Sequence, residues 1–196
     1  MKLKVYKILL VILIISAVIV SFLVITKYIN MSKVENEAKQ IIENINLEIQ
    51  SNNNNEPITE IKQEIQGNKV VGIIKIPKIE LEYPILETTS VETLKLSITK
   101  FWGNQINEIG NVTLAGHNNL SGTMFGKTKK LEIGDIIELT DIQNVTLKYE
   151  IFDKFVIDPN DISCILPVEE NTREVTLITC TNGNKNRLII KAREIK

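Results

Sequence analysis

Residues 174–194 read EVTLITCTNGNKNRLIIKARE, and this stretch carries the clearest signal for the fold. It contains two runs rich in β-branched residues, 174–180 and 187–194, separated by a polar loop with an Asn-Gly pair. This pattern predicts a β-hairpin. Pairing of the two strands would place Cys180 opposite Arg187 at the base of the loop, with Cβ atoms about 5 Å apart. A guanidinium there would favour the thiolate over the thiol and could hold an oxyanion.

The hairpin is the last part of a region rich in short predicted strands, which begins at about residue 70. Turn residues separate these strands from one another. Seven or eight strands in the 127 residues from 70 to 196 favour a closed barrel or a sandwich. A short helix is expected at 90–96, with Ser90 as its N-cap. The predicted strands are 70–76, 80–86, 111–115, 135–140, 145–152, 156–158, 174–180 and 187–194.

The N-terminal residues form an apolar segment. Residues 8–25 make an uncharged run of 18 residues, close to the ~20 needed to span the hydrocarbon core of a bilayer. Because Lys2, Lys4 and Lys7 precede the run, the positive-inside rule places the N-terminus in the cytoplasm and the rest of the chain outside. A cleaved signal peptide is the alternative, but its apolar core is shorter and a small-x-small site follows it. Residues 26–30, TKYIN, offer no such site, so we expect an uncleaved anchor.

Residues 31–69 connect this anchor to the β-rich region. Apolar residues recur every three or four positions in 32–50, which predicts a helix, and the Asn-rich stretch 51–57 reads as a linker. A second short periodic segment follows as far as Ile65. The helix could dock on the domain, but we favour a spacer that lifts the domain from the membrane. The predicted division is a cytoplasmic stub and transmembrane anchor at 1–30, a helical, Asn-rich spacer at 31–69 and a β-barrel domain at 70–196.

Charge and cysteine content exclude two classes of function. The chain has 23 Lys and Arg residues against 24 Asp and Glu residues, a formal net charge of −1. Nothing in this balance favours nucleic acid as a partner, because nucleic-acid binding depends on neutralising phosphates. Two cysteines and one histidine cannot supply the four ligands of a structural zinc site built from Cys and His alone.

The reactive side chains are few. His117 is the only histidine, so a Cys–His site can form with Cys180 or with Cys164. Cys164 has apolar neighbours, which favours a small buried hydrophobic residue. His117 follows Gly116 at the end of a predicted strand, so its ring would project at a barrel rim, where it could join Cys180 and Arg187 in one site. Because the domain is predicted to be exported, a disulfide between the two cysteines is the open alternative.

Several stretches of the chain resemble motifs of the sortase family, and the histidine, cysteine and arginine motifs occur in the same order as in that family. Residues 113–117, TLAGH, are similar to the sortase histidine motif. Residues 177–180, LITC, with Arg187 seven positions after the cysteine, are similar to the TLxTC and arginine motifs. Further similarities, which extend the resemblance over about 70–194, are GIIKIPKI at 72–79, the stretch 125–135 with its Gly-Asp pair, and PND at 159–161.

This resemblance implies an eight-stranded β-barrel and a cysteine transpeptidase of the Gram-positive cell wall without a cofactor. Cys180 would cleave a sorting signal of the Leu-Pro-x-Thr-Gly type between Thr and Gly, and an amine of a peptidoglycan precursor would resolve the thioester. His117 would act as general acid and then as general base, and Arg187 would bind the substrate backbone or the oxyanion. The residues expected to contact the substrate are Ala115, Ile162, Ile165 and Thr179.

Class D is the expected subclass, with class A as the alternative, because no lid precedes the domain and no C-terminal membrane helix follows it, unlike in the pilus-polymerising class. Some class A members bind calcium through acidic residues, but Glu132, Glu169 and Glu170 are expected to be surface acids, so no metal is predicted.

Two other functions stay open. One is a different wall-modifying transpeptidase, such as an L,D-transpeptidase, although its Ser-x-Gly-Cys motif is not supplied by Thr179-Cys180. The other is a membrane-tethered β-barrel that only binds, with the two cysteines in a disulfide.

Overall fold

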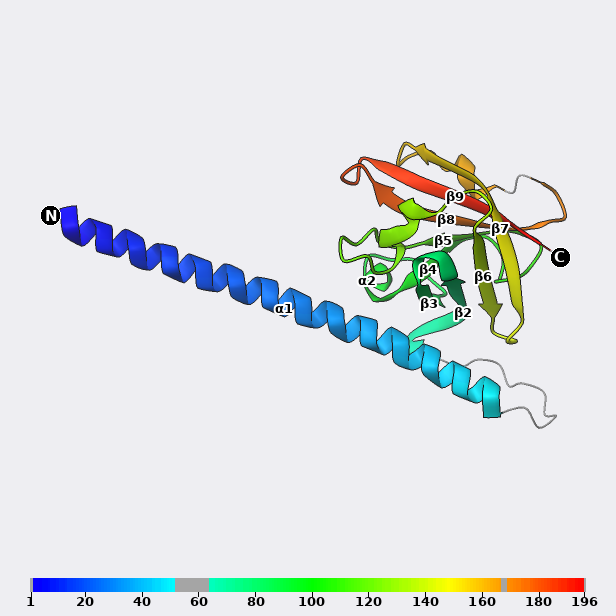
Figure 1. Cartoon of the computed structure of the whole chain (residues 1–196), viewed down its shortest axis with the longest axis horizontal. Helices are drawn as coiled ribbons and strands as arrows, with labels where there is room; N and C mark the ends of the chain where they lie inside the picture. The colour runs from blue at the N-terminus through cyan, green and yellow to red at the C-terminus, as the bar shows by residue number, and fades with distance from the viewer. Residues whose placement is uncertain (1, 52–63, 167–168, 196) are drawn as a thin grey trace. The chain divides into compact units, whose positions relative to one another are not determined.

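The structure, a computed structural model, describes residues 2–51, 64–166 and 169–195 (Figure 1). The chain forms two compact units, Met1–Glu37 and Ala38–Lys196. The domain boundaries expected at residues 30 and 69 separate the predicted anchor, spacer and barrel domain by their roles and not by compactness, and they stay predictions. The predicted linker and the first part of the periodic segment after it lie, apart from Ser51, outside the described residues.

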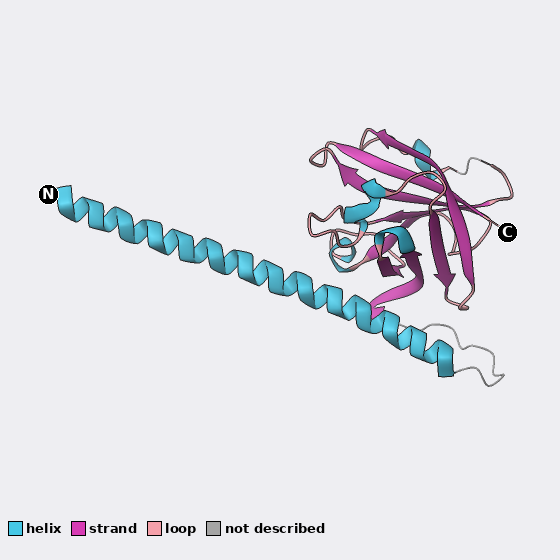
Figure 2. Ribbon diagram, viewed as in Figure 1, coloured by secondary structure: helices cyan, strands magenta, loops and turns pink. Residues whose placement is uncertain are grey.

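Eight strands of the second unit form a closed β-barrel, as predicted (Figure 2). Their order around the barrel is β2-β3-β4-β5-β8-β9-β7-β6, and pairing of β2 with β6 closes it. The short strand β1 extends the sheet beside β2. Neighbouring strands are antiparallel except for the parallel pairs β3–β4 and β5–β8. The strands are β1 (Glu64–Ile65), β2 (Asn68–Ile76), β3 (Leu81–Leu86), β4 (Ile98–Trp102), β5 (Gly110–Ala115), β6 (Ile136–Asp141), β7 (Thr146–Ile157), β8 (Arg173–Thr181) and β9 (Asn186–Glu194).

One long helix precedes the barrel and short helical turns connect its strands. The predicted helix at 90–96 is present as the four-residue α2, and the Ser90 hydroxyl accepts hydrogen bonds from the N–H groups of Glu92 and Thr93, both at 3.1 Å. The N-cap of α2 is Glu92 and not Ser90 as predicted, and the Ser90 hydroxyl binds N–H groups of the turn that leads into the helix. The helices are α1 (Lys2–Ser51), η1 (Pro77–Ile79), α2 (Thr93–Leu96), η2 (Phe125–Lys130) and η3 (Ser163–Ile165).

Two strand predictions differ from the structure. Strand β4 was not predicted, because its side chains do not alternate between buried and exposed: Ile98 and Thr99 are both buried, and Phe101 and Trp102 are both exposed. The strands predicted at 145–152 and 156–158 are one strand, β7, with an irregularity in its pairing to β9. The polar residues Asp153 and Lys154 interrupt the apolar pattern in the middle of β7, where the pairing is irregular, and they looked like a break in the sequence.

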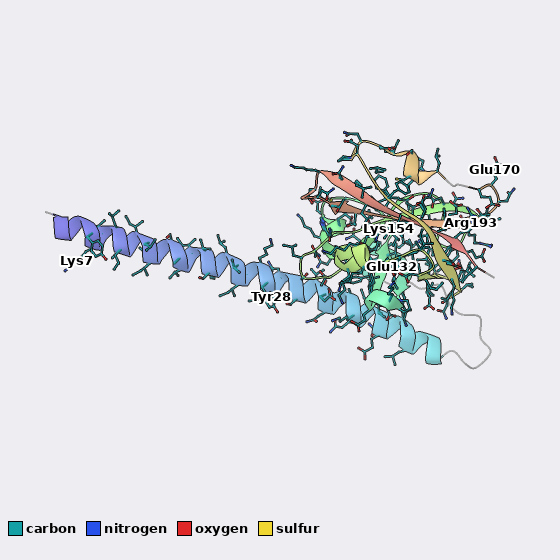
Figure 3. The ribbon with its side chains drawn as sticks, turned by 45° about the horizontal axis from the view of Figure 1, so that its top comes forward. Lys7, Tyr28, Glu132, Lys154, Glu170 and Arg193 are labelled. Atoms are coloured by element: carbon teal, nitrogen blue, oxygen red, sulfur yellow. The ribbon has the colours of Figure 1, made fainter. Side chains whose placement is uncertain are left out.

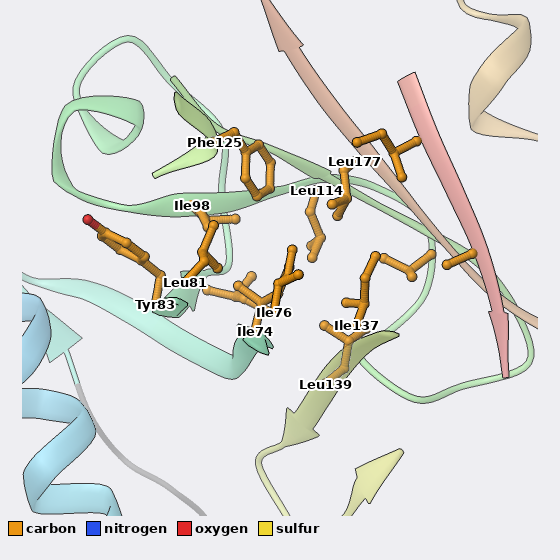
Figure 4. Packing of buried hydrophobic residues seen from close by; sticks show 14 of the residues in the cluster. Ile74, Ile76, Leu81, Tyr83, Ile98, Leu114, Phe125, Ile137, Leu139 and Leu177 are labelled. Carbon is orange, nitrogen blue, oxygen red and sulfur yellow. The ribbon is translucent and has the colours of Figure 1, made fainter. Parts of the chain in front are cut away.

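The interior of the barrel is one large apolar core (Figure 4). Ile74 of β2, Leu114 of β5 and Leu177 of β8 are among its buried members. β2 and β6 approach each other so closely that a Cβ atom at Gly72 would lie 2.5 Å from the carbonyl oxygen of Thr140. Glycine is therefore the residue that allows this pair of strands to close the barrel.

The last part of α1 packs on the outside of the barrel. Ala38, Ile41, Ile42 and Ile45 are buried, at the spacing of one helix face. Ile41 and Ile45 form a second apolar cluster with the following residues of the barrel region: Ile65, Val70, Ile73 and Leu86. This part of α1 is therefore docked on the barrel and is not the free spacer that we favoured from the sequence. Because one face of β2 meets the core and the other meets the helix, the strand is apolar almost throughout.

The first unit consists of the apolar part of α1. Within the described residues, one helix is long and apolar enough to cross a membrane, and its span is Tyr6–Ile45 with a mean hydropathy of 3.4 in the most apolar window. Large apolar side chains from Ile8 to Ile25 are exposed on all faces. A helix that is apolar all round needs an apolar environment, which a lipid bilayer provides.

Replacing Ile45 tests the packing of the helix on the barrel. Ile45→Ala should lower the free energy of unfolding of the barrel domain by about 2–4 kcal/mol, because it removes a fully buried side chain. Leu47→Ala is the matched control, since Leu47 lies on the same helix and is 56% exposed, and it should change stability by less than about 0.5 kcal/mol. Urea unfolding of the full-length chain in detergent micelles, followed by circular dichroism, measures both. Equal losses would mean that this helix face does not pack on the barrel.

Candidate active site

The parallel pairing of β5 and β8 brings the histidine and the cysteine to one edge of the barrel. Ala115 pairs with Ile178, and the N–H of Gly116 donates to the carbonyl oxygen of Ile178 at 3.2 Å. Two positions further along both strands, His117 and Cys180 reach the same level. Because side chains alternate in a strand, Cys180 lies on the face that Ile178 occupies, and His117 lines the same surface from the segment that follows β5.

The hairpin predicted from β8 and β9 is confirmed, with the predicted register. Cys180 pairs with Arg187 across the base of the loop. Three consecutive loop residues, Asn182, Gly183 and Asn184, have positive φ angles of 51°, 64° and 70°. Asn and Gly tolerate this backbone region better than other residues do, which explains the turn signal in the sequence.

One groove of about 300 Å³ borders all of these side chains. It lies on the outer face of β5, β8 and β9, and the connection between β7 and β8 forms one of its walls. The groove is mainly apolar, as substrate grooves generally are, with a few polar side chains at one place. Each of the seven residues that the sequence analysis selected lines it: His117, Cys180, Arg187, Ala115, Ile162, Ile165 and Thr179.

Two hydrogen bonds join the histidine segment to the cysteine strand. The Asn118 side-chain amide donates to the carbonyl oxygen of Cys180 at 2.8 Å, and the Thr179 hydroxyl donates to the carbonyl oxygen of Gly116 at 2.7 Å. The Thr179 side chain is buried in this role, so its hydroxyl holds the two strands together. Asn118 was not selected from the sequence, and its place directly after the histidine is the one signal that could have identified it.

Gly116 is required by close packing beneath the histidine. A Cβ atom at this position would lie 2.8 Å from the ring of Phe125, which is fully buried. The N–H of Phe125 also donates to the carbonyl oxygen of His117 at 3.0 Å. The segment after β5 is therefore held from below, while the His117 side chain itself is exposed.

Carbonyl groups of the β8–β9 loop and of the first residue of β9 hold the Arg187 guanidinium. Its Nη1 donates to the carbonyl oxygens of Asn184 and Asn186, each at 3.2 Å. Both bonds use the same nitrogen, and the side chain is half-buried. These bonds orient the planar fork of donors, and Arg187 lines the groove that Cys180 also lines.

Both cysteines are free thiols, which contradicts the disulfide alternative. Cys180 is half-buried in the groove. Cys164 is 4% exposed, and burial raises the pKa of its thiol. A buried thiol with a raised pKa is a poor nucleophile, so Cys164 fits the small buried residue expected from the sequence.

The three acidic residues considered for calcium binding do not form one cluster, because Glu132 lies apart from the adjacent Glu169 and Glu170. Glu132 forms an ion pair with Lys78 at 2.7 Å, and the hydrogen bonds that the Lys78 ammonium donates to Glu132 and Asp135 raise the pKa of that lysine. Glu169 pairs with Arg193 at 2.7 Å. Glu170 lies far from Glu132 (Figure 3). Among the described residues, no three His, Cys, Asp or Glu side chains are grouped as metal ligands.

Comparisons with known proteins agree with this arrangement. The family model described as "Sortase domain" matches residues 74–195. Sortase A of Listeria monocytogenes is 33% identical over 114 residues, which cover 57% of this chain and 49% of that protein. Sortase D of Bacillus subtilis is 33% identical over 110 residues, which cover 56% of this chain and 53% of that protein. The chain therefore spans about half the length of these two relatives.

A solved structure is similar as well. The structure of a Clostridium perfringens Sortase D5 transpeptidase matches with a TM-score of 0.59 and 31% sequence identity. The match covers 66% of this chain and 81% of that chain.

The two thiols should differ strongly in reactivity. The full-length chain in detergent micelles should show two thiols with a disulfide reagent such as DTNB, one fast and one slow. Cys180→Ala should remove the fast phase, because Cys180 borders the groove, and Cys164→Ala should remove the slow phase. The reverse assignment would show that Cys164 is the accessible thiol. Detection of fewer than two thiols in the absence of reductant would support a disulfide between the two cysteines.

Proposed function

This chain belongs to the sortase family, and we propose that it is a cysteine transpeptidase that cleaves cell-wall sorting signals of the Leu-Pro-x-Thr-Gly type. The observation that carries the proposal is that His117, just after β5, Cys180 on β8 and Arg187 on β9 line one groove. A nucleophile, an acid–base group and an oxyanion donor are the three components of acyl transfer through a covalent intermediate.

The reaction has two steps in this proposal. The Cys180 thiolate adds to the carbonyl carbon of Thr in the signal, and the Thr–Gly bond breaks as His117 gives a proton to the leaving amine. The resulting thioester keeps the energy of the peptide bond. An amine of a peptidoglycan precursor then attacks the thioester, His117 takes its proton, and the Cys180 thiolate leaves. Arg187 stabilises the negative oxygen in both steps or binds the substrate backbone.

The groove walls provide the contacts for the signal peptide. Ala115, Ile162 and Ile165 present apolar surface that suits the Leu and Pro side chains of the signal. Thr179 would contribute through its backbone, because its hydroxyl already binds Gly116. No cofactor takes part in these steps.

Subclass and cellular position are further parts of the proposal. The class D assignment stays a prediction, since relatives named Sortase A and Sortase D are equally similar at 33% identity. We also propose that α1 anchors the protein in the cell membrane by contact with lipid, as a single span with the N-terminus in the cytoplasm and the barrel outside. The basic residues before the apolar segment support this orientation. Surface proteins with sorting signals would then reach the enzyme on the same membrane.

Substitution of the three site residues tests the function. Cys180→Ala should abolish cleavage of a fluorogenic Leu-Pro-x-Thr-Gly peptide, and His117→Ala should lower kcat/KM by about 10²–10⁴-fold because no group protonates the leaving amine. Arg187→Ala should lower kcat/KM by about 10²-fold or more, and Arg187→Lys should restore little, because an ammonium lacks the planar fork. The measurement is steady-state cleavage by the full-length chain in detergent micelles over a panel of residues at x.

Cys164→Ala is the matched control, because it removes the other cysteine and should leave kcat/KM close to that of the parent. Loss of activity in Cys164→Ala together with full activity in Cys180→Ala would contradict the proposed site. Absence of cleavage in the parent with every peptide of the panel, with and without an amine acceptor, would contradict the transpeptidase function.

The orientation of the anchor has its own test. Protease added to intact cells should digest the barrel domain, and the protein should stay with the membrane fraction after a high-salt wash, because an apolar helix and not surface charge holds it. Mass spectrometry should find the N-terminal residues in the mature protein. A soluble form that begins near residue 30 would show that the segment is a cleaved signal peptide.

A further inference from the structure

The groove wall between β7 and β8 is bonded to side chains beneath it. Three consecutive carbonyl groups of this wall, at Cys164, Ile165 and Leu166, accept hydrogen bonds from side chains of the barrel. The Asn111 amide donates to Ile165 at 2.8 Å and to Cys164 at 3.4 Å. The Lys191 ammonium donates to Leu166 at 2.8 Å. Side chains therefore fix this part of the wall to the outer face of the barrel.

The donors lie on the same strand faces as the groove. Thr176 pairs with Lys191, and the next pairs on the same face of the hairpin are Ile178 with Ile189 and Cys180 with Arg187. Every second pair of an antiparallel hairpin points to the same side, so all three pairs share one face. Asn111 lies on β5 four positions before Ala115, so its side chain shares the face of Ala115. Outward-facing polar residues of a barrel usually meet water. These are covered by the wall: Asn111 is 6% exposed, Thr176 is fully buried and Lys191 is 4% exposed.

Further polar groups orient these donors. The Thr176 hydroxyl donates to the Asn111 side-chain oxygen at 3.0 Å, which turns the amide nitrogen toward the wall. The Glu174 carboxylate lies 4.0 Å from the Lys191 ammonium and 3.0 Å from the Arg193 guanidinium, so the buried charges compensate one another. Lifting the wall would break these hydrogen bonds and expose Asn111 and Lys191 to water, so the net free energy of the hydrogen bonds favours the closed wall.

We propose that Asn111 and Lys191 are positioning residues that hold the wall in its substrate-binding position before the substrate arrives. The wall carries Ile162 and Ile165, whose side chains border the groove beside Cys180. A wall that is already ordered loses little conformational freedom when a peptide binds, so the anchors lower KM and have little effect on kcat. This role rests on the proposed transpeptidase function, whereas the anchoring itself can be measured without any reaction.

Cys164 reports on the anchoring. In a Cys180→Ala background it is the only cysteine of the full-length chain, and it is buried where the wall is anchored. Lys191→Met keeps the length of the side chain and removes its donor, so the wall should open more often and the rate constant of Cys164 with DTNB should rise about tenfold. Burial raises the pKa of the Cys164 thiol and the charge of Lys191 opposes this rise. Electrostatics alone would therefore make Lys191→Met react more slowly, and only opening of the wall makes it react faster.

Lys154→Met is the matched control. Lys154 also donates to backbone carbonyl groups, those of Lys129 at 2.8 Å and Leu131 at 2.7 Å, but these lie outside the groove. The DTNB rate of Cys164 should change less than about twofold in this variant. An equal acceleration in Lys154→Met and Lys191→Met would mean that the whole domain opens, and it would overturn the proposal.

Two further variants keep the test decisive if Lys191→Met does not fold. Thr176→Val preserves a β-branched shape and removes the hydroxyl that orients Asn111, and it should raise the Cys164 rate about threefold. Asn111→Leu removes the amide itself and should raise the rate more than Thr176→Val does. If the variants still unfold in a cooperative thermal transition and Cys164 reacts with DTNB at the same rate as in the parent, these side chains do not anchor the wall.

The positioning role is tested with Cys180 intact. Peptide cleavage by Lys191→Met and Thr176→Val should show KM raised about threefold to tenfold, and kcat within about twofold of the parent. Faster Cys164 modification with unchanged KM would show that the contacts are structural only and would overturn the role in substrate binding. If the parent cleaves no peptide, the proposed function fails, whereas the DTNB measurements still decide whether these side chains anchor the wall.

Discussion

The parallel pairing of β5 with β8 is the constraint on which the site depends. Its register, with Ala115 beside Ile178, brings two residues that are 63 positions apart in the chain to one level at the edge of the barrel. The hydrogen bonds donated by Thr179 and Asn118 then fix the histidine segment beside the cysteine strand. A slip of one position would turn one of the two side chains away from the groove, because neighbouring residues of a strand face opposite sides.

The outer face of β5, β8 and β9 has two uses along its length. Near the loops it forms the floor of the groove, with Cys180 and Arg187 at its end. Further along the same strands it is polar and lies beneath the β7–β8 wall, where Asn111 and Lys191 bind the carbonyl groups of the wall. One sheet surface therefore carries the reactive groups and also supports the wall that faces them. Rigid strands are well suited to this task, because a site on them keeps its geometry.

Sequence reasoning found the hairpin, the closed barrel and seven of the residues that line the groove, and it failed where burial depends on distant segments. Strand β4 was missed because its side chains do not alternate in burial. The end of α1 was assigned to a spacer, although its apolar face at Ile41 and Ile45 packs on the barrel. Asn118 and Asn111 were not selected, since an asparagine near a strand end is ordinary in a sequence and its partner lies more than 50 positions away.

The sequence by itself determined the strand periods, the Asn-Gly turn that places Cys180 opposite Arg187, and the apolar N-terminal segment, because each of these depends on neighbouring residues. Only the tertiary structure decided which outward-facing polar residues are covered. Lys191 in the pattern RLIIKARE looks like an ordinary surface lysine, and it is buried because the β7–β8 connection folds over it. Burial is a property of the segments that meet in space, and no local pattern of residues contains that information.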